Sequence, residues 1–92
     1  MVQQVRAAHI LVKTREEAMD IYQQIQQGAD FAALAKARST CPSGRNGGDL
    51  GWFGRGQMVK PFEDVCFGYN TGDFTVVQTQ FGWHVIYIIA QR

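Results

Sequence analysis

The chain has little cysteine and little proline. Its 92 residues include two cysteines, Cys41 and Cys66, and two prolines, Pro42 and Pro61. One pair of cysteines cannot form the disulfide framework of a small secreted domain, so free thiols and a cytoplasmic location are the simpler expectation. A chain of this length corresponds to one domain, and we expect a single domain over residues 1–92.

An excess of charge of one sign and a long apolar run are also missing. The formal net charge is +1, so no strong field attracts nucleic acid or an anionic membrane. No apolar run approaches the length of a membrane span. Residues 1–13 lack the apolar core and cleavage site of a signal peptide, as an excised domain of a larger exported protein also would. Met1 close to the first expected strand favours a free-standing chain. We expect a monomer without nucleic-acid or membrane partners.

Glycine and large apolar residues are concentrated in residues 41–62. Glycine allows positive φ angles and close backbone approach, at an entropic cost. A stretch that is both glycine-rich and apolar is typical of the rim of a hydrophobic pocket, although a long irregular loop with buried anchors would have the same composition. Six of the ten glycines lie here, with five large apolar residues among them: Gly44, Gly47, Gly48, Gly51, Gly54 and Gly56; Leu50, Trp52, Phe53, Met58 and Phe62.

The periodicity of apolar residues predicts strands and helices around this stretch. Thr14 and Glu17 form a capping box before an apolar i, i+3, i+4, i+7 stripe, and Asp30 can cap the next helix. We expect strands over 5–12, 49–53, 74–79 and 83–90, helices over 14–27, 30–39 and 61–69, and a turn or single helical turn over 41–44. This order indicates an α+β fold with an antiparallel or mixed sheet.

The candidate chemistry lies in His9, His84 and Cys41, because both histidines fall in the middle of apolar strands. A Cys-His hydrolase would also need an orienting group and an oxyanion hole, which no motif marks. A zinc site that adds Cys66 would lack the close paired spacing of such ligands, and Cys66 fits the apolar stripe of a helix. Two further alternatives are weaker still. Gly54 begins a G-x-G that does not continue as a dinucleotide motif, and single-stranded nucleic-acid binding would want more cations near the aromatic residues.

Four short motifs resemble the parvulin-type peptidyl-prolyl cis-trans isomerases, most closely the small single-domain bacterial parvulins. These motifs are AHILVK at 8–13, GGDLG at 47–51, GQM with PF within 56–62, and FGWH at 81–84. They occur in the family's order and spacing and cover nearly the whole chain. The resemblance implies a four-stranded antiparallel sheet surrounded by four short helices, with the two histidine strands side by side in its centre.

The resemblance also implies roles for eight positions. His9 and His84 match the paired histidines, Cys41 the active-site cysteine that is Asp in some members, and Thr79 a hydroxyl that bonds to the histidine pair. The proline ring would enter a pocket formed by Leu50, Met58 and Phe62, whose wall is open to solvent. Phe81 would add a further wall.

The function implied is isomerisation of X-Pro bonds by non-covalent binding in an apolar pocket, without a metal or cofactor. The partners would be proline-containing peptides and unfolded protein segments. The alternative is a peptide-binding chaperone module with weak or no turnover. The phospho-directed parvulins carry a basic insertion after the first strand, but here Lys13 and Thr14 lead straight into the helix. With Val59 and Phe81 also apolar, we expect no preference for phosphorylated substrates and a preference for uncharged residues before proline.

Overall fold

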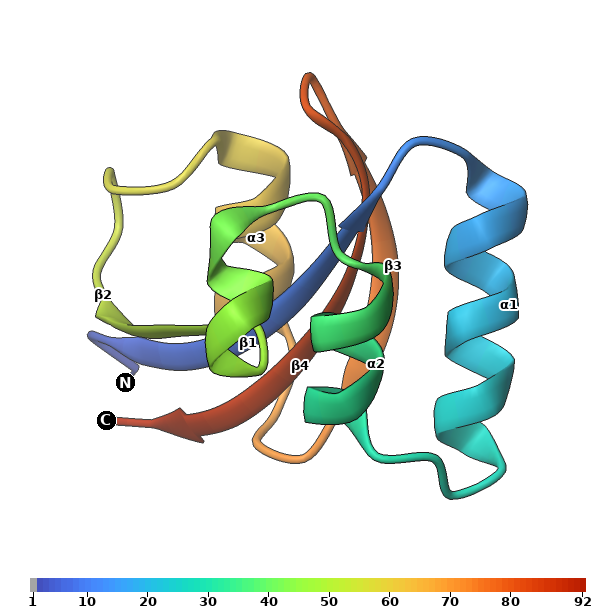
Figure 1. Cartoon of the computed structure of the whole chain (residues 1–92). Coiled ribbons are helices and arrows are strands. Elements are labelled where there is room, and N and C mark those ends of the chain that lie inside the picture. The colour runs from blue at the N-terminus through green and yellow to red at the C-terminus, as the bar shows by residue number, and fades with distance from the viewer. Residues whose placement is uncertain (1) are drawn as a thin grey trace.

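A single antiparallel sheet organises the computed structural model, which describes residues 2–92 (Figure 1). The strand order is β2-β1-β4-β3, so β1 and β4 lie in the centre as expected. The elements, in chain order, are β1 (Val5–Val12), α1 (Arg15–Gln26), α2 (Phe31–Arg38), η1 (Pro42–Asn46), β2 (Asp49–Phe53), α3 (Lys60–Gly68), β3 (Phe74–Thr79) and β4 (Gly82–Gln91). The α+β class and the antiparallel four-stranded sheet are thereby confirmed.

One of the four expected helices is not an α-helix. η1 is a 3-10 helix of five residues, closed by a bond from the Gly44 N–H to the Cys41 carbonyl (2.9 Å) and another from the Gly47 N–H to the Gly44 carbonyl (3.1 Å). Such i to i+3 bonds suit a short segment that begins with proline and ends at a glycine with positive φ. Over residues 2–92 the sheet is therefore accompanied by three α-helices and one 3-10 helix.

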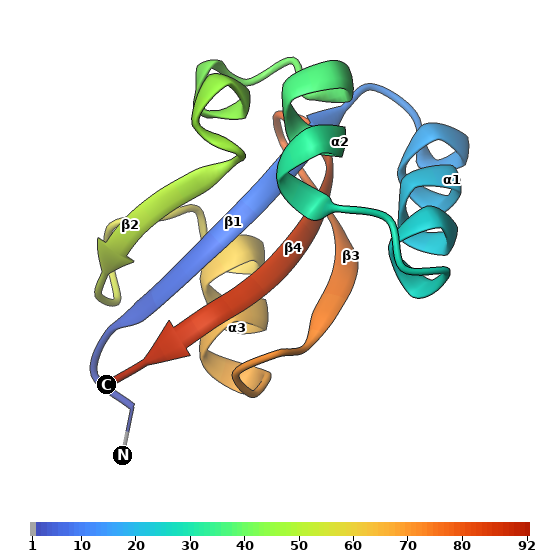
Figure 2. The same cartoon turned by 60° about the horizontal axis from the view of Figure 1, so that its bottom comes forward.

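Each face of the sheet has its own apolar core. α3 covers one face, while α1 and α2 cover the other (Figure 2). The residues on the α3 side include Val5, Ala7, Phe53, Phe62, Cys66, Ile86 and Ile88, and those on the opposite side include Ile10, Val12, Ala18, Ile21, Ala35 and Val85. The odd and even positions of β1 thus face different cores, as strand geometry requires. Within residues 2–92, no helix is both long enough and apolar enough to cross a bilayer.

The helix starts follow the capping residues. Thr14 Oγ1 accepts the Glu17 N–H at 3.2 Å and Asp30 Oδ2 accepts the Ala33 N–H at 3.2 Å, which fixes the first turns of α1 and α2. The capping box differs in one detail. The Thr14 hydroxyl donates to the Glu17 carboxylate at 3.2 Å, where a reciprocal bond to the backbone of residue 14 was expected.

Candidate functional site

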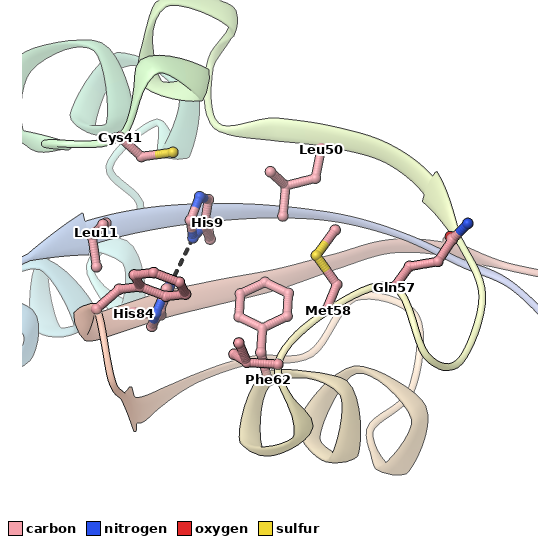
Figure 3. A pocket seen from close by; sticks show the side chains of 10 residues that line it. His9, Leu11, Cys41, Leu50, Gln57, Met58, Phe62 and His84 are labelled. Atoms are coloured by element: carbon pink, nitrogen blue, oxygen red, sulfur yellow. Dashed lines mark hydrogen bonds between the residues drawn. The ribbon is translucent and has the colours of Figure 1, made fainter.

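A cavity of about 410 Å³ opens between the centre of the sheet, α3 and the glycine-rich stretch (Figure 3). Strands β1 and β4 supply its floor, and β2 with the following loop supplies one wall. Its lining is almost entirely apolar side chains together with the two histidines: His9, Leu11, Cys41, Leu50, Gln57, Met58, Val59, Phe62, Phe81 and His84. The sequence prediction of a pocket at residues 41–62 therefore coincides with a real concavity.

The two histidines are diagonal neighbours on adjacent antiparallel strands. His9 lies opposite Ile86 and His84 lies opposite Leu11, so the two imidazoles project from the same face, two positions apart. Their Nδ1 atoms are 2.8 Å apart, and the side chains are 6% and 3% exposed. The register of β1 on β4 thus brings two residues 75 positions apart into direct hydrogen-bond contact.

Hydroxyl groups extend this contact in both directions. Thr79 Oγ1 lies 2.6 Å from His84 Nε2 and accepts the Phe81 N–H at 3.2 Å. At the other end, Ser43 Oγ lies 3.2 Å from His9 Nε2. The Ser43 hydroxyl donates to Cys41 Sγ, also at 3.2 Å. The result is one continuous chain from the β3–β4 turn to the thiol at the cavity rim.

The inventory of donors assigns the tautomers of the two rings. Ser43 already donates to sulfur, so its oxygen must accept from His9 Nε2–H, which leaves His9 Nδ1 as an acceptor. His84 Nδ1–H then donates to His9, and His84 Nε2 accepts the hydroxyl proton of Thr79. Thr79, His84, His9 and Ser43 each donate once in the direction of Cys41, and both imidazoles are neutral in this assignment.

Burial keeps both rings uncharged at neutral pH. Desolvation lowers the pKa of His84 to about 4. Desolvation, with a smaller contribution from the neighbouring His84, lowers the pKa of His9 to about 4 as well. Because neither ring carries a proton charge at pH 7, the floor of the cavity is polar in its hydrogen bonding but has no net charge.

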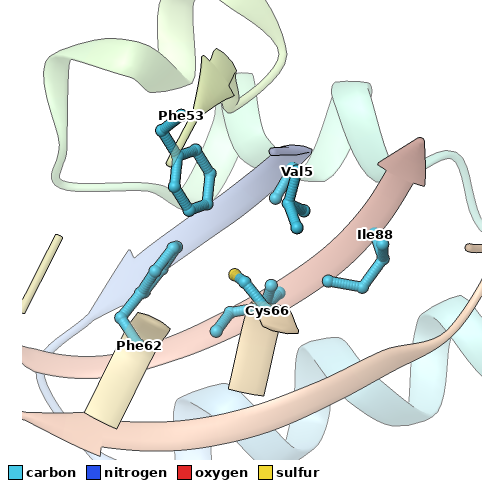
Figure 4. Close-up of a cluster of buried hydrophobic side chains, with 7 residues drawn as sticks. Val5, Phe53, Phe62, Cys66 and Ile88 are labelled. Carbon is cyan, nitrogen blue, oxygen red and sulfur yellow. The ribbon is translucent and has the colours of Figure 1, made fainter. Parts of the chain in front are cut away.

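Phe62 closes the floor from the α3 side. Its ring meets His9 edge-on at 5.5 Å and His84 at 5.2 Å between centroids. The side chain is only 3% exposed and also packs in the core beside Phe53 and Cys66 (Figure 4). The expectation that Phe62 is an open pocket wall is therefore wrong in part, because most of its surface belongs to the core.

The loop that follows β2 and forms one wall of the cavity is attached to α3 through Glu63. This carboxylate is 9% exposed, accepts the Gly56 N–H at 2.5 Å and pairs with the Arg55 guanidinium at 3.2 Å. Arg55 in turn lies over the Phe67 ring, 4.5 Å from its centroid. Buried carboxylates need such partners. Glu63 thereby fixes the position from which Met58 reaches the cavity.

The backbone at Gly48, in the rim of the cavity, leaves no room for a side chain. Its φ is +82°, and a Cβ built there would lie 2.3 Å from the His9 carbonyl oxygen, far inside van der Waals contact. The Gly48 carbonyl also accepts the His9 N–H at 2.9 Å. A side chain at this position would therefore push apart the two backbones that hold His9 in place.

All eight residues singled out from the sequence are found at this site. Seven line the cavity, and Thr79 bonds to His84 behind it. Sequence reasoning did not identify Ser43 or Glu63, and it did not place Leu11 or Gln57 in the lining. The proximity of Cys41 to Ser43, two residues later in a turn, was the only available signal for the former.

Cys66 is separate from the other thiol and the histidines. It is fully buried on α3, where desolvation raises its pKa to about 12. The four-ligand zinc site considered from the sequence is therefore not assembled. Across residues 2–92, no three side chains among His, Cys, Asp and Glu are grouped so that they could hold a metal ion.

The chain is similar to known proteins over most of its length. A family model described as the PPIC-type PPIase domain matches residues 1–92. The foldase protein PrsA of Geobacillus sp. (strain WCH70) is 49% identical over 84 residues, which are 89% of this chain and 30% of that protein. The chain thus spans about a third of the length of the curated relatives it matches. A putative peptidyl-prolyl cis-trans isomerase, Cbf2 of Campylobacter jejuni, is 45% identical over 91 residues, covering 89% of this chain and 33% of its own length.

Solved structures show the same fold. The crystal structure of the peptidylprolyl isomerase PrsA from Bacillus anthracis superposes with a TM-score of 0.96 at 34% identity, over 99% of this chain and 43% of that one. NmPin, the parvulin of Nitrosopumilus maritimus, superposes with a TM-score of 0.88 at 35% identity, over 98% of this chain and 99% of that one.

Proposed function

The chain belongs to the family of PPIC-type peptidyl-prolyl cis-trans isomerase domains, and from this premise we propose that it accelerates rotation about X-Pro bonds in peptides and unfolded protein segments. The observation that carries the proposal is the apolar cavity above a neutral, fully hydrogen-bonded histidine pair. Such a cavity accepts an uncharged ring.

The physical problem is the partial double bond of the amide. Rotation about a peptide bond faces a barrier of about 18–20 kcal/mol. X-Pro bonds therefore isomerise over tens to hundreds of seconds unaided. The planar amide is charge-separated by resonance, and the twisted transition state has lost this resonance. An apolar pocket penalises the planar ground state more than the twisted state, which is catalysis by differential binding.

The residues divide this task between them. Leu50, Met58 and Phe62 hold the proline ring, with the exposed Phe81 as an outer wall. Cys41, at the end of the hydrogen-bonded chain, stands beside the substrate carbonyl. No bond is broken, so the thiol acts as a polar neighbour and not as a nucleophile. His9 and His84 keep this arrangement rigid, in addition to stabilising the sheet.

The proposed substrates are not phosphorylated before proline. Only Lys13 and Thr14 separate the end of β1 from the start of α1, which leaves no room for a basic insertion. A phosphate dianion is held by several charge-assisted hydrogen bonds, and this segment cannot supply such a cluster. Val59 and Phe81 make the rim apolar, which favours uncharged residues before proline.

The test compares turnover of Leu-Pro, Ala-Pro, Glu-Pro and phosphoserine-Pro peptides at one ionic strength, by protease-coupled and NMR-exchange assays. We expect the first two to be isomerised fastest. Fastest turnover of the phosphopeptide would contradict the specificity, and the absence of turnover on all four would contradict the enzyme.

A peptide-binding module with weak turnover is the second candidate. It is favoured by the similarity to a Campylobacter jejuni protein whose structure is described among SurA-like chaperones, with a TM-score of 0.92 and 40% identity over 100% of this chain and 40% of that one. Binding of the four peptides without isomerisation would support it. A monomeric state and a cytoplasmic location stay predictions, for light scattering and cell fractionation to test.

A further inference from the structure

A second cavity lies directly beside the proline pocket and differs from it in character. Its volume is about 560 Å³, and polar atoms dominate its lining. It is formed where α2 runs into η1, by Lys36, Ser39, Thr40, Cys41, Pro42, Gly44 and Arg45. Cys41 lines both cavities, so the two are adjacent at this residue. We refer to this second cavity as the basic groove.

The basic groove carries two cations and no carboxylate. Lys36 comes from the last turn of α2 and Arg45 from η1, and both side chains are exposed. Within residues 2–92 the ion pairs involve Arg6, Arg38, Arg55 and Lys60, so neither cation of the groove has an acidic partner. Ser39 and Thr40 line the same space, where the Thr40 hydroxyl donates to the Leu11 carbonyl at 3.2 Å and Ser39 Oγ accepts the Leu11 N–H at 3.1 Å. This chemistry fits an anionic group that can accept hydrogen bonds.

Exposed cations are usually only solvated, so their charge alone would not indicate a ligand. What distinguishes this pair is its position. A peptide with its proline ring in the apolar cavity and its preceding carbonyl beside Cys41 must continue, toward its amino end, past the thiol. The basic groove adjoins the apolar cavity at Cys41, on the side of α2 and η1.

Chain geometry then selects the residue that reaches the groove. The residue before proline is restricted to extended conformations. In an extended chain, side chains two positions apart point the same way and are separated by about 6.5–7 Å. The side chain two residues before proline therefore faces the same surface as the proline ring, one step beyond Cys41.

We infer that the basic groove is a substrate subsite in which Lys36 and Arg45 bind the carboxylate of an Asp or Glu two residues before the proline. This inference rests on the proposed isomerase function and extends it to the sequence around the X-Pro bond. The residue immediately before proline stays over the apolar rim, so the expected preferred segment is acidic, then apolar, then proline.

The experiment compares two end-blocked peptides, Ala-Glu-Leu-Pro-Phe and Ala-Gln-Leu-Pro-Phe. They differ only in a side-chain carboxylate, which is an amide in the second peptide. We measure kcat/KM by NMR exchange and Kd by NMR titration at low salt and at 0.5 M NaCl. Two exposed ion pairs correspond to a preference of about three- to ten-fold for the Glu peptide at low salt. High salt should reduce the preference strongly, because screening shortens the range of both pairs.

The variants are compared by the ratio of kcat/KM for the Glu peptide to kcat/KM for the Gln peptide. This ratio cancels any general effect on folding or activity. The double variant Lys36→Gln/Arg45→Gln should bring the ratio to about one. The matched control Lys13→Gln/Arg15→Gln removes the same net charge from exposed positions outside both cavities and should keep the preference.

The outcomes separate this inference from the proposed function. Equal kcat/KM and Kd for the two peptides in the unaltered protein would overturn the subsite while leaving the isomerase intact. A preference that survives in the Lys36/Arg45 variant, or is lost in the Lys13/Arg15 control, would also overturn it. Tighter binding of the Glu peptide without turnover of either would support the subsite and contradict the isomerase.

Discussion

The buried histidine pair makes the stability of the protein depend on pH in a defined window. In the folded chain the pKa of both His9 and His84 is about 4, against about 6.5 for an unperturbed histidine. Between these values the unfolded chain binds more protons than the folded one. The contribution of the pair is therefore fully present above about pH 6.5 and is lost as the pH falls toward 4.

The size of the effect follows from the number of protons taken up on unfolding. At pH 5.2 each unfolded histidine is about 95% protonated and each folded one about 6%, so unfolding takes up about 0.9 proton per ring. One proton corresponds to about 1.36 kcal/mol per pH unit. The free energy of unfolding should thus fall by at most about 1 kcal/mol per pH unit for each histidine, and about 2 kcal/mol for the pair.

The assay is urea unfolding at several pH values from 4.8 to 7.5, compared among three proteins. The unaltered chain should show the full slope. His84→Leu removes one titrating ring and should show about half of it. It should also lose about 1–3 kcal/mol at pH 7.5, because His9 Nδ1 then has no partner. Thr79→Val keeps both rings and should keep the full slope, although it removes the bond to His84 Nε2.

A flat stability between pH 5 and 6.5 in the unaltered chain would refute the assignment of a buried neutral pair. Activity on an X-Pro peptide, measured on the same samples at pH 7.5, addresses the role of the pair. A loss of turnover in His84→Leu beyond the loss of folded protein indicates a role in the site. Parallel losses indicate that the pair only stabilises the sheet.

Three further predictions concern the cavity. Cys41→Ser and Cys41→Asp should keep partial activity, and mass spectrometry should find no covalent intermediate; loss of all turnover with a trapped thioester would contradict the mechanism. Met58→Ala should lower kcat/KM with less than about 2 kcal/mol lost in stability, whereas Phe62→Ala should lose both, with about 3–5 kcal/mol for a buried ring; unchanged activity in Met58→Ala would move the pocket elsewhere. Glu63→Gln should raise KM more than it lowers kcat, because the loop wall loses its ion pair, while Asp64→Asn, a matched change at an exposed neighbour, should do neither.

The regular elements could be predicted because their signals are local. The first strand has the predicted bounds, Val5–Val12, and the last differs by one residue at each end. The starts of α1 and α2 follow from their N-cap residues, Thr14 and Asp30. Each of these side chains accepts a backbone N–H three residues later in the chain. The segment after Cys41 has no such local signal, since a turn and a 3-10 helix use the same residues.

The site was predictable only where a resemblance supplied long-range pairing. Periodicity placed His9 and His84 in strands, but their contact depends on the register of β1 against β4, which no local pattern fixes. Glu63 shows the opposite case. In the sequence it is an ordinary helical glutamate, and its burial arises only because the loop from β2 folds back over α3. Sequence reasoning therefore missed the contact that depends on the path of the loop after β2.

Burial of polar side chains in the centre of a sheet costs free energy unless they are hydrogen-bonded. The hydrogen bonds that meet this requirement also hold the site in its shape. Buried polar groups are tolerated when every donor and acceptor is paired, and within residues 2–92 no buried side-chain nitrogen or oxygen lacks a partner. The pairing runs from Thr79 through both rings to Ser43 and Cys41, with four of these five groups bonded on two sides. Removal of any inner member takes one hydrogen bond from each of its two neighbours, so the cost falls on both the sheet and the cavity floor. Stability and pocket geometry are for that reason coupled through the same atoms, whereas the loop wall held by Glu63 depends on a separate set of contacts.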